Sequence, residues 1–250
     1  GTSNVAVGYA ALDANTSADQ NTAVGYNALT AATTGGANTA IGSQTLVAST
    51  TAANNTAVGY LAMNSNTTGT NNVAVGRDAL AANTTGGENV AIGVDCLDSN
   101  TTASYNTGVG YNVLEATTTG GSNTAMGRYA LAANTTGNNN TAVGMGSLDA
   151  NTTAAYNTAV GAQALGLNTT GTRNTAVGAL SSDANTTGST NTAVGYASLG
   201  ANTTGAQNVA IGDTCLANNT TASNNVAIGQ DAMVANTTGA SNVGIGAFAL

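Results

Sequence analysis

Five tyrosines carry the side chains best suited to binding a ligand, and their positions differ by multiples of 17 residues. They are Tyr9, Tyr26, Tyr60, Tyr111 and Tyr196. An aromatic ring exposed to solvent can stack on a sugar ring, and the tyrosine hydroxyl can add a hydrogen bond. The column is interrupted, so we favour packing on the surface or between chains. These tyrosines are therefore weak candidates for a ligand-binding site.

Catalytic and metal chemistry lack the residues that they require. The chain has no His and no Lys, and its eleven acidic residues are scattered singly. General acid–base catalysis, an activated nucleophile and a transition-metal site each need such side chains close together. We therefore expect a protein that is not an enzyme and that holds no metal or cofactor. Four aspartates spaced by multiples of 17 are interpreted as solubilising surface charges: Asp13, Asp98, Asp149 and Asp183.

The sequence Asn-Thr-Thr, as at Asn83-Thr84-Thr85, recurs along the chain and allows three interpretations. It fits an N-glycosylation acceptor, its stacked threonines could form a flat ice-binding face, or it could be a structural turn. Adjacent residues of a strand point to opposite faces, so these threonines do not make a two-column array. We favour the turn and keep a repetitive binding face for ice or glycan as an alternative function.

All of these candidates lie on one 17-residue repeat that must position them. Asn begins each of its 15 occurrences, from Asn4 to Asn242, and Gly occupies the fifth place in all 15. We number the places of the repeat from this Asn. Such regularity is typical of a repeat protein and not of a globular domain. The sequence therefore predicts a single array over residues 1–250.

The first five places alternate between large and small residues. Places 2 and 4 carry Thr or Val and mostly Val or Ile, while places 3 and 5 carry Ala or Gly. This period predicts a strand with places 2 and 4 on one face. We expect place 4, such as Val24, and place 9, such as Leu29, to form the core. One Val and one Leu per coil bury little area for 17 ordered residues, so the Ala/Gly face is expected to pack against partner chains.

Two short strands and two turns per repeat predict an all-β fold, a parallel β-solenoid with 17-residue coils. Asn at one corner of successive coils can form a ladder of amide hydrogen bonds, and Gly or Ala after two threonines lets the chain turn. Neither end carries an atypical polar repeat, which predicts uncapped strand edges and further pairing. One coil represents the residues expected to have structural roles: Asn21, Val24, Gly25, Leu29, Thr33 and Thr34.

The net charge, the hydrophobicity and the cysteine positions limit the partners and cross-links that we expect. Three Arg against eleven acidic residues give a net charge of −8, which argues against nucleic acid. No apolar run approaches the roughly 20 residues that a bilayer crossing needs, so we expect no membrane insertion. Cys96 and Cys215 lie seven periods apart, roughly 34 Å at one strand spacing per coil, so they cannot form a disulfide. We expect two buried, inert thiols.

The motif of Asn21–Leu29 and the spaced Asn66–Gly69 resemble the head repeats of trimeric autotransporter adhesins and related repeats of phage tail fibres and bacterial surface fibres. The adhesin signature Val-Ala-Ile-Gly is matched at Val90–Gly93, Val209–Gly212 and Val226–Gly229. The resemblance covers the whole chain. It implies a left-handed β-roll, three identical chains side by side, and an extracellular location on a cell or a virion.

The expected function is a structural fibre segment of an extracellular adhesin or phage tail fibre. Such a segment would provide reach, rigidity and attachment to a host-surface glycan or receptor. Two alternatives stay open. One is the repetitive binding face for ice or glycan, and the other is a subunit of a head-to-tail extracellular filament.

Overall fold

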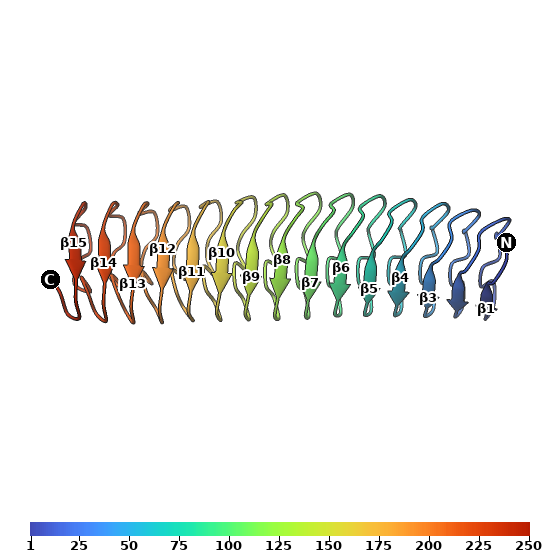
Figure 1. Cartoon of the computed structure of the whole chain (residues 1–250), viewed down its shortest axis with the longest axis horizontal. Helices are drawn as coiled ribbons and strands as arrows, with labels where there is room; N and C mark the ends of the chain where they lie inside the picture. The colour runs from blue at the N-terminus through green and yellow to red at the C-terminus, as the bar shows by residue number, and fades with distance from the viewer. The chain divides into compact units, whose positions relative to one another are not determined.

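The computed structural model describes residues 1–250 as an all-β structure with one three-residue strand at the start of each repeat. The chain divides into two compact units, Gly1–Asn123 and Thr124–Leu250. Each unit is a parallel β-solenoid of 17-residue coils, as the sequence predicts, and each is described by itself (Figure 1). The chain forms no α-helix with the length and hydrophobicity that a bilayer crossing requires.

Strands that follow one another in the sequence pair within each unit. The first unit contains β1 (Val5–Val7), β2 (Thr22–Val24), β3 (Thr39–Ile41), β4 (Thr56–Val58), β5 (Val73–Val75), β6 (Val90–Ile92) and β7 (Thr107–Val109). The second contains β8 (Thr124–Met126), β9 (Thr141–Val143), β10 (Thr158–Val160), β11 (Thr175–Val177), β12 (Thr192–Val194), β13 (Val209–Ile211), β14 (Val226–Ile228) and β15 (Val243–Ile245). Pairing is parallel at an offset of 17 residues, so Ala23 lies beside Ala40.

The sequence analysis expected a second strand in each coil, but the wall opposite the strands does not form one. Places 7 and 9 adopt the left-handed region, with φ of 54° at Asn27 and 53° at Leu29. Ala28 and Leu29 are both fully buried, although consecutive residues of a strand would point to opposite faces. The left-handed residue turns both side chains inward. The backbone still bonds between coils, because the N–H of Leu29 donates to the carbonyl of Thr45 at 2.9 Å.

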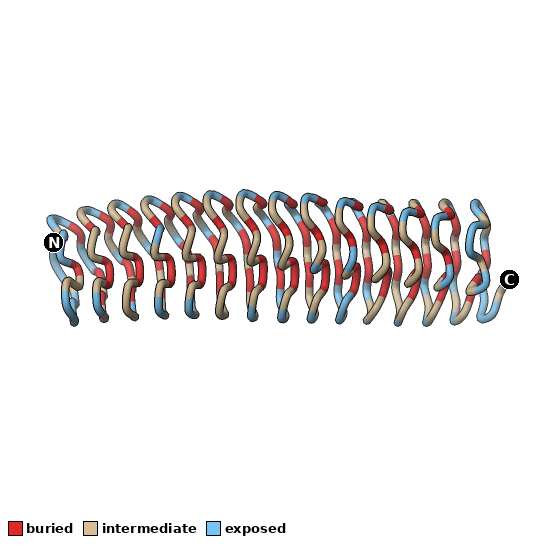
Figure 2. Tube along the Cα trace, turned by 180° about the vertical axis from the view of Figure 1, so that it is seen from behind, coloured by how far each residue is buried: buried red, intermediate tan, exposed pale blue.

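The inward and outward faces of the strands are the reverse of the prediction. Ala23, at place 3, is fully buried, whereas Ile41, at place 4, is 41% exposed. Val24 is likewise only partly buried, so it belongs to the surface and not to the core. Figure 2 shows buried residues recurring at matching places of successive coils. The Ala face therefore lines the inside of the coil and cannot pack against partner chains.

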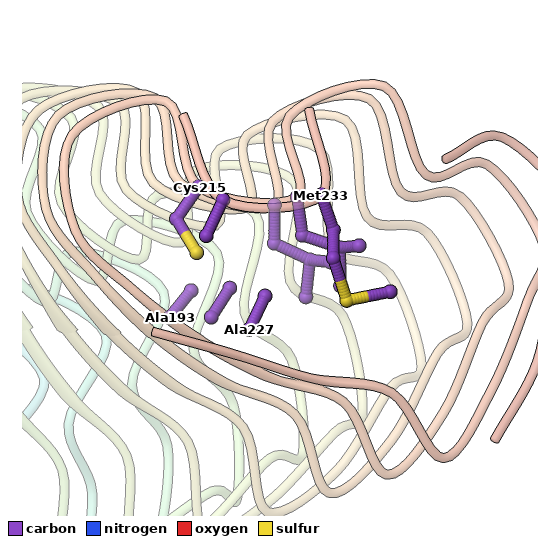
Figure 3. Close-up of a cluster of buried hydrophobic side chains, with 8 residues drawn as sticks. Ala193, Cys215, Ala227 and Met233 are labelled. Atoms are coloured by element: carbon purple, nitrogen blue, oxygen red, sulfur yellow. The ribbon is translucent and has the colours of Figure 1, made fainter. Parts of the chain in front are cut away.

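The core is thin because the two walls lie close together. In the second unit, Cys215 and Met233 project from one wall toward Ala193 and Ala227 on the strand wall (Figure 3). The fit is tight at Gly244, where an added Cβ would lie 2.6 Å from Cγ of Met233. Only Ala or Gly fits at place 3 for this reason. Leu or Met at place 9, which the sequence analysis assigned to the core, supplies the largest fully buried side chains.

Candidate functional site

Two columns of buried asparagine hold the coils in register. At place 1, the backbone N–H of Asn72 donates to Oδ1 of Asn55 at 2.9 Å. The amides of Asn55 and of Asn66, at place 12, both donate to the carbonyl oxygen of Gly69, at 2.9 and 3.0 Å. The expected ladder therefore exists, and it has two columns that meet at the place-15 carbonyl. The first column contains Asn21.

The place-12 column is incomplete in the first unit. Three coils carry Ala32, Ser49 or Thr117 where the other coils carry Asn. Two buried atoms have no hydrogen-bond partner as a result. They are Oγ of Ser49, which is too short to follow the column, and Oδ1 of Asn100, whose donor would come from place 12 of the next coil. A buried polar atom without a hydrogen-bond partner lowers the free energy of unfolding, so the column contributes less stability at these coils than elsewhere.

The outward side chains at places 2 and 4 of each unit form what we call the strand face. They are Thr or Val at place 2 and mostly Val or Ile at place 4, and none is charged. Val160 and Val177 are each 37% exposed, and Met126 is 44% exposed. Because the strands pair without a bulge, these side chains lie in two straight rows within a unit. Sequence reasoning placed the apolar place-4 row of this surface in the core.

The five candidate tyrosines all project into solvent at place 6, beside the strand face. Tyr9 and Tyr26 lie on consecutive coils, and their rings stack with centroids 5.5 Å apart and an interplanar angle of 13°. Tyr60, Tyr111 and Tyr196 are 45–55% exposed and lie on coils whose sequence neighbours carry no tyrosine at this place. The structure therefore brings two candidates together and leaves the other three apart.

The Asn-Thr-Thr segments are turns with a buried first residue. Asn83 is fully buried, and its amide donates to Oδ1 of Asn66 at 2.8 Å and to the carbonyl of Gly86 at 3.0 Å. A folded chain offers no free amide there for glycosylation. The hydroxyl of Thr84, at place 13, donates to the carbonyl of Thr101 at 2.9 Å, as that of Thr33 does to Thr50. In the inner coils, only the third residue of the segment, at place 14, is exposed, as at Thr34.

The acidic residues do not gather into a metal or catalytic cluster. No three His, Cys, Asp or Glu side chains converge on one point. Arg77 forms ion pairs with Asp78 and Asp95. Burial, together with repulsion from nearby carboxylates, raises the pKa of Asp98 above its usual 3.8.

Partial burial also raises the pKa of Asp149 and Asp183. Three of the four aspartates that we interpreted as surface charges are thus partly desolvated, which the sequence did not indicate.

The two thiols lie inside the coils. Cys96 and Cys215 are both free and fully buried. Burial raises the pKa of Cys96 to about 12, so its reactive thiolate form is rare at neutral pH. The predicted burial at place 8 is confirmed.

Comparison with known proteins adds no family to this picture. No protein-family model matches the chain, and no curated protein matches it. The chemistry of its own surfaces is therefore the basis on which a function is proposed.

Proposed function

We propose that this chain is a structural segment of an extracellular fibre, of the adhesin or phage tail-fibre kind, that provides reach and rigidity. The observation that supports it best is the repetition of the same bonds in nearly every coil of each unit. Strand pairing, two asparagine columns and the place-13 hydroxyls all connect a coil to its neighbours. Energetic coupling between nearest neighbours is how solenoid proteins achieve stiffness along one axis. The motif resemblance to surface-fibre repeats supports the extracellular location.

We further propose that chains associate side by side as a homotrimer through the strand face. This face is uncharged and its place-4 row is apolar, in a chain of net charge −8 whose charged residues all lie at places 6, 7, 10, 16 or 17. Rows of exposed Val and Ile are typical of surfaces that are covered by another protein. A second copy offers an identical spacing of rows, so side chains of two copies can interdigitate at every coil.

Sedimentation of a charged variant tests the association. Val160→Lys together with Val177→Lys places two cations on the strand face, where a second copy would bury them. Thr153→Lys with Thr170→Lys adds the same charge at place 14, which is exposed away from the strands. We expect the wild type and the place-14 variant to sediment as trimers and the strand-face variant as a monomer. A monomeric wild type at micromolar concentration would exclude the trimer.

A repetitive binding face for ice is the second candidate, and one observation favours it. Thr or Val at place 2 and Val or Ile at place 4 form flat rows at a constant strand spacing of about 4.8 Å. This is the regular array that the threonines of places 13 and 14 do not provide. Thermal hysteresis separates the two candidates, because a shaft leaves ice growth unchanged. Hysteresis that the strand-face lysines abolish and the place-14 lysines spare would favour ice binding.

A further inference from the structure

The second unit has a hollow of about 230 Å³ on the wall opposite the strands. It spans three successive coils. The residues that line it are Gly146, Asp149, Gln163, Gly166, Leu167 and Asp183.

The hollow arises where the sequence departs from its own repeat. Gly146 is the only glycine at place 7, and Leu167 stands at place 11, where every other coil has Ala, Ser or Asn. Gly166 at place 10 removes the side chain that would lie between Asp149 and Asp183, which occupy the same place one coil before and after it. Gly200 also stands at place 10, so the residues that distinguish this hollow from the rest of the wall are Gly146 and Leu167, each unique at its place.

The backbone does not require glycine at the floor of the hollow. Gly146 has φ of +63°, which non-glycine residues such as Gln163, at +56°, adopt at the same place of other coils. A Cβ added at Gly146 would meet only Cγ of Gln163, at 3.7 Å, which is ordinary van der Waals contact. A side chain there would fit and would occupy the hollow.

The charge at the hollow lacks a counter-charge within the chain. Partial burial raises the pKa of both Asp149 and Asp183, so the fold disfavours their ionised forms. No basic residue lines the hollow. A cation that entered between the two carboxyls would favour their ionised forms and so offset this desolvation, because a nearby opposite charge lowers the pKa of a carboxyl.

We propose that this hollow binds the cationic side chain of an arginine or lysine that a partner protein presents. The volume is below the roughly 300–1,000 Å³ of sites for drug-sized ligands and suits a single side chain. Asp149 and Asp183 hold the charged end, and the amide of Gln163 offers a carbonyl acceptor. Leu167, which is 58% exposed, contacts the apolar stem. The site lies away from the strand face, so it does not depend on the proposed self-association.

Nuclear magnetic resonance titration of the full chain, labelled with 15N-leucine, tests this proposal. The probes are the N-acetyl methylamides of arginine and lysine, and the control is that of citrulline, which has the shape of arginine without its charge. We expect saturable shifts of the Leu167 amide with the arginine or lysine probe and none with citrulline. Equal shifts with citrulline would overturn the proposal.

Three variants locate the binding. Asp149→Asn with Asp183→Asn should weaken binding about tenfold or more, and Gly146→Gln, which fills the hollow, should abolish it. Asp98→Asn changes the equivalent place of a coil in the first unit and should leave the affinity unchanged. An affinity that the double Asn variant retains would show that the probes bind elsewhere and would overturn the assignment.

Discussion

Gly108 lies opposite Cys96 across the interior of the coil, and the space between them does not admit a larger side chain at position 108. A Cβ added at Gly108 would lie 2.6 Å from Sγ of Cys96 and 3.4 Å from Cγ1 of Val113. Cys96 and Val113 both replace the usual small residue at place 8, while Gly108 replaces the usual Ala at place 3. The larger side chains on one wall are thus matched by a smaller one on the other.

This match predicts a compensating pair of substitutions. Gly108→Ala should lower the free energy of unfolding by roughly 1–3 kcal/mol, because inserting a methyl group into a close-packed core forces its neighbours to shift. Cys96→Ala in the same chain should recover most of that loss by removing the clashing sulfur. Denaturant unfolding of the single and double variants measures both effects. Additive losses in the double variant would contradict the direct contact.

The incomplete asparagine column predicts a stabilising substitution. Ser49→Asn places an amide where it can donate to the carbonyl of Ala52 and accept from the amide of Asn66. It also removes a buried hydroxyl that has no partner. The expected gain is about 1 kcal/mol for the restored hydrogen bonds, read as a higher denaturation midpoint. Ser43→Asn, at the solvent-facing place 6, is the matched control and should change stability little. An equal gain there would show that the column is not the cause.

The reversed faces predict opposite outcomes at neighbouring residues of β10. Ala159→Asp puts a carboxylate into the coil interior, where Ala159 is fully buried, and should cost several kcal/mol even if the group takes up a proton. Val160→Asp puts it on the strand face and should leave the coil folded. Circular dichroism melting curves at one fixed protein concentration distinguish the two. Loss of the fold in the Val160 variant alone would restore the original assignment of the core.

The raised pKa of Asp98 predicts that this residue makes the first unit less stable at neutral pH than at acidic pH. Burial is the main cause of its raised pKa, followed by repulsion from Asp78, Asp95 and Glu115. A carboxyl with a raised folded pKa binds its proton more tightly in the folded state. Its destabilising effect is therefore absent below its usual pKa of 3.8 and develops as the pH rises through the folded pKa.

Asp98→Asn removes this charge without changing the shape of the side chain. The variant should be more stable than the wild type at pH 7, and the difference should vanish near pH 3. Chemical denaturation at the two pH values measures it. Asp13→Asn serves as the control, because Asp13 occupies the same place of the repeat and its side chain is exposed. A difference at Asp98 that does not depend on pH would rule out titration as its origin.

The repeat length, the parallel pairing and the asparagine ladder could be predicted because each follows from spacing alone. Which face of the strand is buried could not be predicted. Alternation shows that Val24 and Ala23 lie on opposite faces, but it does not show which of the two faces is inside. The distance between the walls decides that, and it admits only the smaller residue. The absence of a second strand could have been predicted from one feature of the sequence. A small residue followed directly by Leu, as at Ala28 and Leu29, places two apolar residues side by side, which strand alternation does not produce.

The site was harder to predict than the fold. The tyrosines at place 6 were found because they are aromatic and recur at the period, and the structure places them at the surface. The hollow was not found, because Gly146 and Gly166 look like ordinary substitutions in a glycine-rich sequence. Only the three-dimensional stacking of coils brings them into one hollow with Asp149 and Asp183. A position-by-position comparison of the repeat with itself would have revealed the departure, though not its meaning.

The asparagine columns also give each unit a polarity. The amide of Asn38 donates backward to Asn21, and that of Asn83 donates backward to Asn66, so the side-chain dipoles point the same way along the coil axis. Their positive ends face the N-terminal coil, as in an α-helix. Backbone bonds of a parallel sheet run in both directions and do not share this bias. Two coils stacked in reverse orientation would set donors against donors, so the columns make one stacking direction electrostatically preferred.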